Sequence, residues 1–126
     1  MDRRHRFALQ AEIWVADYLA AQGGRVLARR WRCRGGEIDL VIRLDGVLCF
    51  VEVKARGRNS WDSAGWEAVG SVKQRRLLLA AAHFLAAHPE LARSVCRFDV
   101  ALVGRTSGGG VRLVAYIAGA FEGSGR

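Results

Sequence analysis

One stretch, "VLCFVEVKAR" at residues 47 to 56, restricts the possible folds more than any other part of the chain. It is almost continuously apolar over the length of one strand, which is typical of a central strand covered on both faces. A chain of 126 residues is long enough for one domain with a real core and too short for two domains of ordinary size. We therefore expect a single domain, residues 1–126, built around this strand.

The first half of the chain predicts one helix and a three-stranded meander. Gly23-Gly24 follows a segment with apolar residues at helical spacing and would end that helix. Gly35-Gly36 makes a turn, and Asp45-Gly46 is a strong signal for a two-residue hairpin, so the strands on either side of these turns should pair antiparallel. The expected elements are a helix over 4–22 and strands over 25–33, 37–44 and 47–56.

The second half predicts a helix that crosses between strands. A polar, Gly- and Ser-rich segment comes first, and Pro89 ends the helix that follows it. A helix between two strands allows them to pair in parallel, so the expected fold class is α/β, with a mixed central β-sheet flanked by helices. The expected elements are a loop over 57–66, a helix over 67–88, a strand over 96–105, and over 111–121 either a strand or a strand fading into the tail.

The charge of the chain points to a partner class. The net charge is +8, and the cations comprise eighteen arginines and only two lysines, Lys54 and Lys73. An excess of fixed positive charge favours polyanions through counterion release and long-range steering. Nucleic acid, and DNA first, is therefore the expected partner. The two isolated lysines are either a hint of a special role or chance.

Cysteine usage and hydropathy indicate the compartment. No apolar stretch approaches the roughly 20 residues that a membrane span requires, and the basic N-terminus leads into an amphipathic pattern without an export signal. Cys33, Cys49 and Cys96 have no CxxC spacing, which favours free, mostly buried thiols. We expect a soluble cytoplasmic protein with no membrane partner, and a homodimer stays open.

Charged residues interrupt two neighbouring apolar strands. Glu52 and Lys54 point to one face of the strand 47–56, and Asp39 lies within the apolar run of the preceding strand. The two-residue hairpin pairs residue 44 with residue 47, and counting back along the strands places Asp39 opposite Glu52 if no bulge intervenes. The two carboxylates would then be cross-strand neighbours, with Cβ atoms about 5 Å apart.

Such a pair needs a compensating cation, because like charges repel and burial makes both costlier. Mg²⁺ or Mn²⁺ accepts one or two carboxylates and often a backbone carbonyl, and keeps water or phosphate oxygens as its other ligands. Lys54 would orient or deprotonate a bound water, or offset charge in the transition state, which suits phosphodiester hydrolysis. The alternative is a buried cluster in which Lys54 only pairs with Asp39 and Glu52. We favour the metal site, since such clusters stabilise little and charges inside apolar strands are rare without a task.

Glu12 is a second unusual acid. It falls four residues after Ala8 and three before Val15, within the apolar stripe of the first predicted helix. It either needs a partner there or sits at the rim of a slightly rotated helix, and periodicity alone leaves these two interpretations equal.

Two levels of resemblance follow from these residues. Asp39 followed by Glu52-Val53-Lys54 resembles the D…ExK signature of the PD-(D/E)XK nuclease superfamily, whose restriction-endonuclease-like core has an α-βββ-α-β order. The stretches "GGEIDLVIR", "FVEVKAR", "VKQRRLLLAAAHFL" and "RFDVALV", in this order, resemble the YraN-like family of small bacterial proteins over roughly residues 5–121.

The superfamily resemblance implies roles for the central residues. Asp39 and Glu52 would ligate Mg²⁺ together with the Val53 carbonyl, and Lys54 would be the catalytic lysine. Glu12 is similar to the first-helix glutamate of Holliday-junction-resolvase-like branches, which would reach the same metal site from the helix.

The resemblance also extends to the second helix. Lys73 and Gln74 resemble a "Kq" pair at the start of the family's second helix, which would contact the site or the phosphate backbone. The YraN-like family itself implies no settled substrate.

The remaining candidates are basic or aromatic side chains. Trp61, in the loop, would stack on an unpaired base or, as we favour, anchor the loop against the domain. Phosphate contacts are one interpretation of the arginine-dense segment, and a solvated edge strand protected by charge is nearly as good. These arginines are Arg29, Arg30, Arg32 and Arg34.

Two functional hypotheses follow. The first is a magnesium-dependent endonuclease that hydrolyses phosphodiester bonds in DNA, including branched or damaged DNA. The second is a nucleic-acid-binding or adaptor module that keeps the nuclease fold with little or no cleavage.

Overall fold

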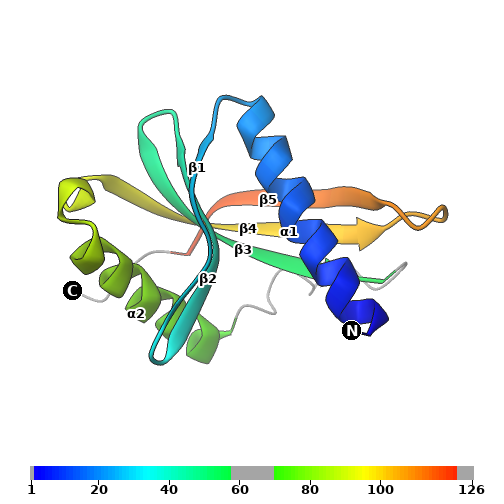
Figure 1. The fold of residues 1–126 in the computed structure, drawn as a ribbon, viewed down its shortest axis with the longest axis horizontal. Helices are drawn as coiled ribbons and strands as arrows, with labels where there is room; N and C mark the ends of the chain where they lie inside the picture. Colours follow the sequence, from blue (N-terminus) through cyan, green and yellow to red (C-terminus); the bar gives the residue numbers. More distant parts are fainter. Residues whose placement is uncertain (1, 58–69, 122–126) are drawn as a thin grey trace.

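A computed structural model describes residues 2–57 and 70–121 of the chain. These residues form two α-helices, one short 3₁₀ helix and five strands in the order α-βββ-α-ββ (Figure 1). The elements are α1 (Arg3–Ala21), β1 (Arg25–Cys33), β2 (Gly36–Leu44), β3 (Val47–Arg56), α2 (Ser71–Ala87), η2 (Pro89–Leu91), β4 (Val95–Arg105) and β5 (Val111–Phe121).

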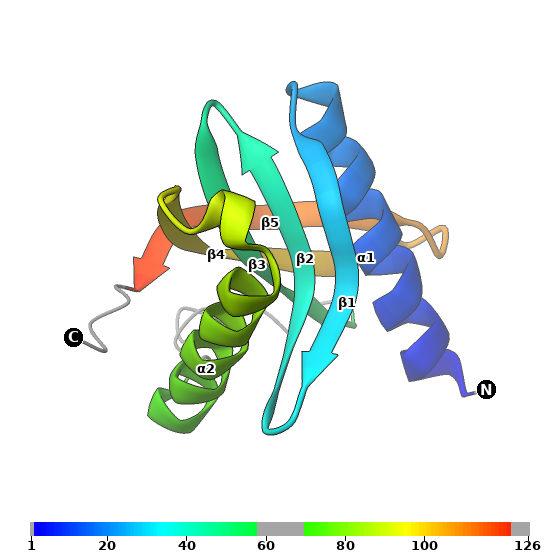
Figure 2. The ribbon, with the colours of Figure 1, turned by 60° about the vertical axis from the view of Figure 1, so that its left-hand side comes forward.

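The five strands form one mixed sheet in the order β1-β2-β3-β4-β5. Only β3 and β4 pair in parallel, and every other pair is antiparallel. The parallel pair is the consequence of α2, which returns the chain so that β4 runs beside β3 in the same direction. Figure 2 shows β1 and β2 running steeply across β4 and β5, so the sheet is strongly twisted. The expected mixed sheet flanked by helices is confirmed.

The strand 47–56 is central, as its composition predicts. Its side chains alternate between two buried clusters, because successive residues of a strand face opposite sides of the sheet. Leu48 and Phe50 pack in the cluster that contains α2, whereas Cys49 and Val51 pack in the cluster that contains α1. The two helices therefore cover opposite faces of β3.

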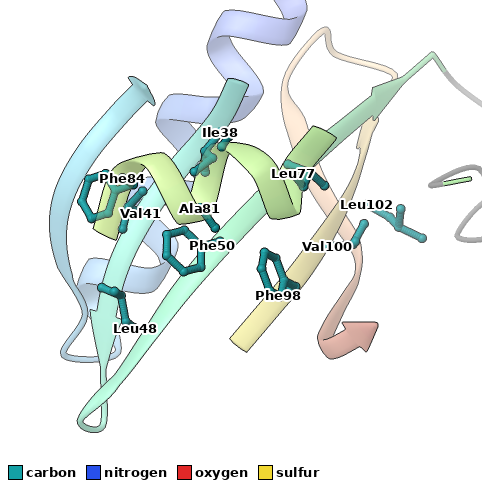
Figure 3. Packing of buried hydrophobic residues seen from close by; sticks show 11 residues of the cluster. Ile38, Val41, Leu48, Phe50, Leu77, Ala81, Phe84, Phe98, Val100 and Leu102 are labelled. Carbon is teal, nitrogen blue, oxygen red and sulfur yellow. The ribbon is translucent and has the colours of Figure 1, made fainter. Parts of the chain in front are cut away.

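Three phenylalanine rings lie among the aliphatic side chains of the cluster under α2 (Figure 3). The Phe50 ring stacks on Phe98 with centroids 5.4 Å apart and meets Phe84 of α2 edge-on at 6.0 Å. Phe84 also meets Trp31 of β1 edge-on at 5.5 Å. These contacts span β1, β3, β4 and α2, so they fix the helix across most of the sheet.

Most element boundaries agree with the sequence prediction, but α2 begins later than expected. Gly70 has an extended backbone and is the N-cap of the helix, which starts at Ser71 and not at Glu67. Glycine has no side chain that could cap the helix. The helix is held instead by the packing of Leu77, Ala80 and Phe84 against the sheet. Residues 67–69, and the expected loop 58–66 with Trp61, lie outside the described residues.

The thiols only partly match expectation. All three are free, but Cys49 alone is buried, while Cys33 is half-buried and Cys96 is exposed. Burial and the nearby Asp99 raise the pKa of the Cys49 thiol to about 11, so it is a core group without thiolate character. Among the described residues, no helix is long and apolar enough to cross a membrane.

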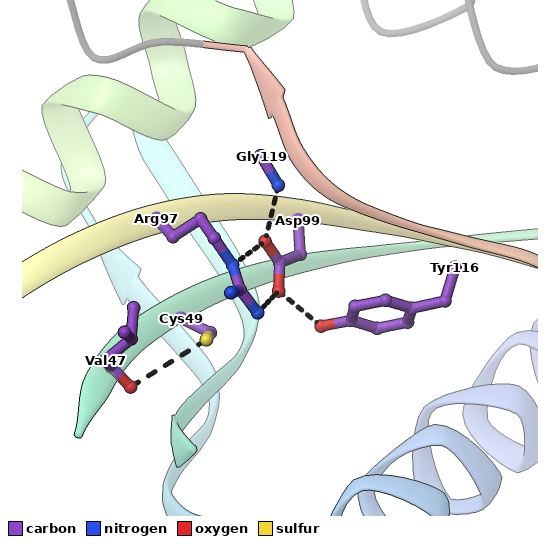
Figure 4. A network of polar contacts seen from close by, with 6 residues as sticks. All are labelled: Val47, Cys49, Arg97, Asp99, Tyr116 and Gly119. Atoms are coloured by element: carbon purple, nitrogen blue, oxygen red, sulfur yellow. Dashed lines mark hydrogen bonds and ion pairs between the residues drawn. The ribbon is translucent and has the colours of Figure 1, made fainter. Parts of the chain in front are cut away.

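A buried carboxylate ties β5 to β4 (Figure 4). The Asp99 side chain is 0% exposed, and Arg97 donates to both of its oxygens, at 2.8 and 3.1 Å. The Tyr116 hydroxyl donates to Oδ2 at 2.6 Å, and the Gly119 amide donates to Oδ1 at 3.0 Å. Gly119 has a φ of 63°, and the register of β4 and β5 shifts between Phe98 and Val100. Asp99 therefore holds a bulged end of β5 in place.

We predict that Asp99→Asn lowers the free energy of unfolding by about 2–3 kcal/mol, because the Arg97 guanidinium loses its buried counter-charge. Urea unfolding followed by far-UV circular dichroism measures the change. Asp45→Asn is the matched control. Asp45 lies exposed in the hairpin with a φ of 52°, which asparagine tolerates, so this change should stay within about 0.5 kcal/mol. Equal unfolding curves for the two variants would show that the network adds nothing.

Candidate metal centre

The backbone pairing of β2 and β3 ends just before Asp39 and Glu52. The register predicted from the hairpin is confirmed from Leu44↔Val47 to Leu40↔Val51, where the ladder ends. Ile38 packs in the α2 cluster and Leu40 in the α1 cluster, although residues two apart in a regular strand share a face. The strand is therefore irregular at Asp39, the residue between them.

The Asp39 side chain takes over where the ladder ends. Its Oδ2 accepts a hydrogen bond from the Val53 amide at 2.8 Å. In an antiparallel strand, the N–H and C=O of one residue point to the same side, so the Val53 carbonyl faces the same gap as this carboxylate. The Asp39 carboxylate and the Val53 carbonyl therefore both face this gap.

Glu52 supplies the second carboxylate. Its side chain is only 5% exposed, and Lys73 Nζ lies 2.6 Å from Oε2. That contact is an ion pair by distance, yet Oε2 has no hydrogen bond of good geometry. A buried carboxylate oxygen without a well-formed hydrogen bond is costly, and it is the kind of atom that a bound cation would satisfy.

Lys73 contacts this carboxylate, and Lys54 is within its electrostatic reach. Burial is the main cause that lowers the pKa of Lys54, followed by the charge of Lys73, while Glu52 opposes both. For Lys73, burial acts to lower the pKa, but the contact with the Glu52 carboxylate and its negative charge outweigh burial and raise the pKa. The two lysines of the sequence therefore lie near one acid, and of the two positions expected for Lys73, the site or the phosphate backbone, the structure has its side chain at the site.

The two acids perturb each other. Burial raises the pKa of the Asp39 carboxyl group well above its usual range, and the neighbouring Glu52 carboxyl group raises it further. The Val53 amide acts in the opposite direction by stabilising the charged form. Two carboxyl groups held this way favour a shared proton or a shared cation.

Glu12 approaches from the other side of the sheet. Burial raises the pKa of its carboxyl group, Arg30 lowers it, and the charges of Glu37 and Glu52 raise it. Its Oε1 lies 3.9 Å from Arg30 Nε, so its ion-pair partner is an arginine of β1. The structure places Glu12 within electrostatic reach of the two central acids, without a direct contact to either.

A cavity of about 390 Å³ opens beside the acids, between the β1–β2 turn and the first half of α2. Gly36 makes this close packing possible, because a Cβ there would lie 2.5 Å from the Arg76 carbonyl oxygen. Glu37 and Arg76 line the cavity and were not singled out from the sequence. The only sequence signal for Glu37 is its position two residues before Asp39.

The other predicted residues divide into two groups. Gln74 lies in the first turn of α2, and its backbone N–H donates a hydrogen bond to the Gly70 carbonyl oxygen at 2.9 Å.

The four arginines predicted as phosphate contacts, on β1 and just after it, are all exposed. Two of them meet acids: Arg32 lies 3.0 Å from Glu37, and Arg30 contacts Glu12. Arg29 and Arg34 contact no acid within the described residues, so phosphate contact and edge protection both stay open for them.

The oxygen ligands at this site fit a hard divalent cation that takes only a few of its ligands from the protein. Within residues 2–57 and 70–121, no three His, Cys, Asp or Glu side chains converge into a metal cluster of their own. Mg²⁺, however, usually binds through one or two carboxylates and leaves other positions to water and phosphate. Asp39, the poorly satisfied Glu52 oxygen and the Val53 carbonyl match that requirement.

Comparison with known proteins identifies relatives along the whole chain. The family described as "Uncharacterised protein family UPF0102" matches residues 11–103. UPF0102 protein gll3754 of Gloeobacter violaceus is 93% identical over 126 residues, which is 100% of both chains. A UPF0102 protein of Synechococcus sp. (strain JA-3-3Ab) is 55% identical over 114 residues, 88% of this chain and 86% of its own. UPF0102 protein RPA0323 of Rhodopseudomonas palustris is 50% identical over 98 residues, 78% of this chain and 73% of its own. The expected YraN-like resemblance is confirmed at this level, and these names state no activity.

We predict that Asp39→Asn flattens the pH dependence of stability in the absence of divalent ions. A carboxyl group with a raised pKa holds its proton longer in the folded state, so stability falls as pH rises above about 4, where the unfolded carboxyl group ionises. The amide side chain keeps an oxygen acceptor for Val53 and does not ionise. Urea unfolding at pH 5 and pH 8 in chelator should show a loss for the wild type at least about 1 kcal/mol larger than for the variant. Asp17→Asn, an exposed acid of α1, should leave the wild-type loss unchanged, and an equal result for both variants would contradict the prediction.

Proposed function

This chain belongs to the UPF0102 family, and from the geometry of its acidic cavity we propose that it is a metal-dependent nuclease that hydrolyses phosphodiester bonds in DNA. The observation that carries the proposal is the convergence of Asp39, Glu52 and Lys73 on one cavity at the break between β2 and β3, with Lys54 two residues from Glu52 on the same strand. Opposite charges are concentrated there in a half-buried cavity, which is unusual without a chemical task.

Asp39, Glu52 and the Val53 carbonyl would hold Mg²⁺ or Mn²⁺. Such an ion polarises a phosphoryl oxygen and makes water a better nucleophile at neutral pH. The Asp39 carboxylate is already oriented by the Val53 amide, so little rearrangement is required of it. Lys54, on the same strand, would orient the attacking water or offset the negative charge that builds on the phosphate.

Residues around this core would complete the site. Lys73 is 46% exposed although it pairs with Glu52, so it can reach either the carboxylate or a phosphate at the cavity mouth. Glu12 and Gln74 would act from α1 and from the first turn of α2, as the resemblance implies. Arg29, Arg30, Arg32 and Arg34 are proposed as further backbone contacts along β1.

DNA is the proposed substrate because the chain carries a net charge of +8 and the cavity contains basic side chains beside its acids. Endonucleolytic action is the narrower proposal, with branched or damaged DNA as the substrates to compare against linear duplex.

A second candidate is a nucleic-acid-binding module with little or no cleavage. The observation that favours it is the Lys73–Glu52 ion pair, which gives the buried carboxylate a cation without any metal. Binding to DNA would then not depend on the acids, and Lys54 and Lys73 would serve only to balance their charge.

We predict saturable Mn²⁺ binding in calorimetric titration, lost in Asp39→Asn and in Glu52→Gln. Lys73→Gln should bind Mn²⁺ several-fold more tightly, because its ammonium group no longer competes with the ion for Glu52. Asp17→Asn should match the wild type, since Asp17 is exposed and lies outside the site. Unchanged affinity in Asp39→Asn would place the ion elsewhere.

We predict metal-dependent cutting of linear, nicked or branched DNA that falls by about 100-fold or more in Lys54→Met and in Asp39→Asn. Product formation on labelled substrates in Mg²⁺ and in Mn²⁺ measures the rates. Arg112→Gln, an exposed change on β5, should cut like the wild type. Cutting that survives in Lys54→Met or Asp39→Asn would contradict this site. Tight DNA binding without cutting by the wild type would favour the binding module.

A further inference from the structure

We propose that Arg25 and Arg43 form a separate phosphate-binding site for a nucleic-acid backbone, at the opposite end of α2 from the acidic cavity. The proposal rests on the proposed function for the class of its ligand. It is carried by a second cavity and by an unusual pairing of two like charges.

The second cavity has a volume of about 450 Å³ and lies at the C-terminal end of α2. Leu27 and Phe84 form part of its apolar wall, and His88 follows the helix at its rim. The His88 ring stacks on Phe84 at 4.0 Å, and its Nδ1 lies 2.8 Å from the Phe84 carbonyl oxygen. These contacts make the helix end a formed wall of the cavity.

Arg25 and Arg43 line the same cavity and face each other across two strands. They are direct partners in the β1–β2 register. Like charges at directly opposed positions destabilise a sheet, with Cβ atoms about 5 Å apart. Neither guanidinium group pairs with a carboxylate in the part of the chain that the structure describes.

Edge protection does not explain this pair. Charged side chains on an edge strand discourage pairing with other chains, and Arg25 of β1 fits that explanation. Arg43 does not, because β2 lies between β1 and β3 inside the sheet. A function that uses both cations together accounts for their juxtaposition.

A phosphodiester is the ligand that fits best. Guanidinium groups bind phosphate oxygens through paired, charge-assisted hydrogen bonds, and two of them side by side would share one phosphate or hold adjacent ones. Glu90 is an acid on the rim, so the two arginines and Glu90 together still leave a net positive charge. That charge and the open rim favour a polyanion over a small neutral molecule.

The distance to the acidic cavity suits a continuous strand of nucleic acid. The nearest lining residues of the two cavities on α2 are Leu77 and Phe84, seven residues or about 10 Å apart along a helix. On β2 they are Asp39 and Arg43, four residues or about 13 Å apart along a strand. Both spans correspond to about three or four nucleotides at about 3.4 Å each along a duplex. The arginine pair would therefore hold the backbone about three or four nucleotides from the phosphate at the acidic cavity.

The test is DNA binding by Arg25→Gln/Arg43→Gln, measured by fluorescence anisotropy with a labelled 20-nucleotide strand and a 20-base-pair duplex. Chelator prevents cleavage, and the salt concentration is varied between 50 and 200 mM. Arg3→Gln/Arg112→Gln is the matched control, because it removes two exposed arginines from α1 and β5, outside the cavity. Urea unfolding checks that the arginine-pair variant is at least as stable as the wild type, as removal of opposed like charges implies.

We expect the arginine-pair variant to bind about tenfold more weakly or worse at 100 mM salt, with a salt slope smaller by about two. The control should lose less than about threefold. Equal losses in the two double variants would overturn the phosphate site, whatever the outcome for cleavage. A selective loss with no cutting by the wild type would support the phosphate site and overturn the nuclease proposal. Absence of DNA binding by the wild type would overturn both.

Discussion

The hydrogen bond from the Val53 amide to Asp39 is the interaction on which the candidate site depends. Where β2 and β3 separate, the Asp39 side-chain oxygen accepts the hydrogen bond that a backbone carbonyl of β2 would accept in a continuous ladder. Without a polar side chain there, the Val53 amide would be a half-buried donor without a partner, which is costly. The same carboxylate that closes the gap also lines the cavity, where a bound cation would contact it.

Charge is arranged around this break at the expense of stability. Burial and the repulsion between the two carboxyl groups oppose the ionisation of Asp39 beside Glu52. Lys73 contacts Glu52, and the positive charges of Lys73 and Lys54 repel each other. By contrast, the Asp99 network is fully paired and holds β5 without strain on its charges. The chain thus contains one buried acid, Asp99, with hydrogen bonds to both oxygens, and another, Glu52, with an oxygen that has an ion pair but no well-formed hydrogen bond. A buried acid with an incomplete set of hydrogen bonds in a cavity is the better indication of a function that needs an external partner.

Local patterns predicted much of this arrangement. The two-residue hairpin at Asp45-Gly46 predicted the correct register from Leu44↔Val47 to Leu40↔Val51, because a tight turn leaves little freedom in the pairing that follows it. The expected pair of Asp39 with Glu52 lies beyond the end of this ladder. The start of α2 was wrong, since helical periodicity continues through Gly70 although its backbone is extended. Asp99 interrupts an apolar strand just as Asp39 does, yet its partners lie up to twenty residues away, and no sequence pattern joins them.

The sequence by itself determined the elements, the central strand, the pairing of β2 with β3 and the family, because these follow from local periodicity, turn chemistry and similarity along the chain. Only the tertiary structure decided what comes together in space. It brought Lys73 to Glu52, and it placed the end of α2 beside Arg25 and Arg43. The physical reason is that such contacts depend on how a helix lies across a twisted sheet, and many distant residues set that packing together.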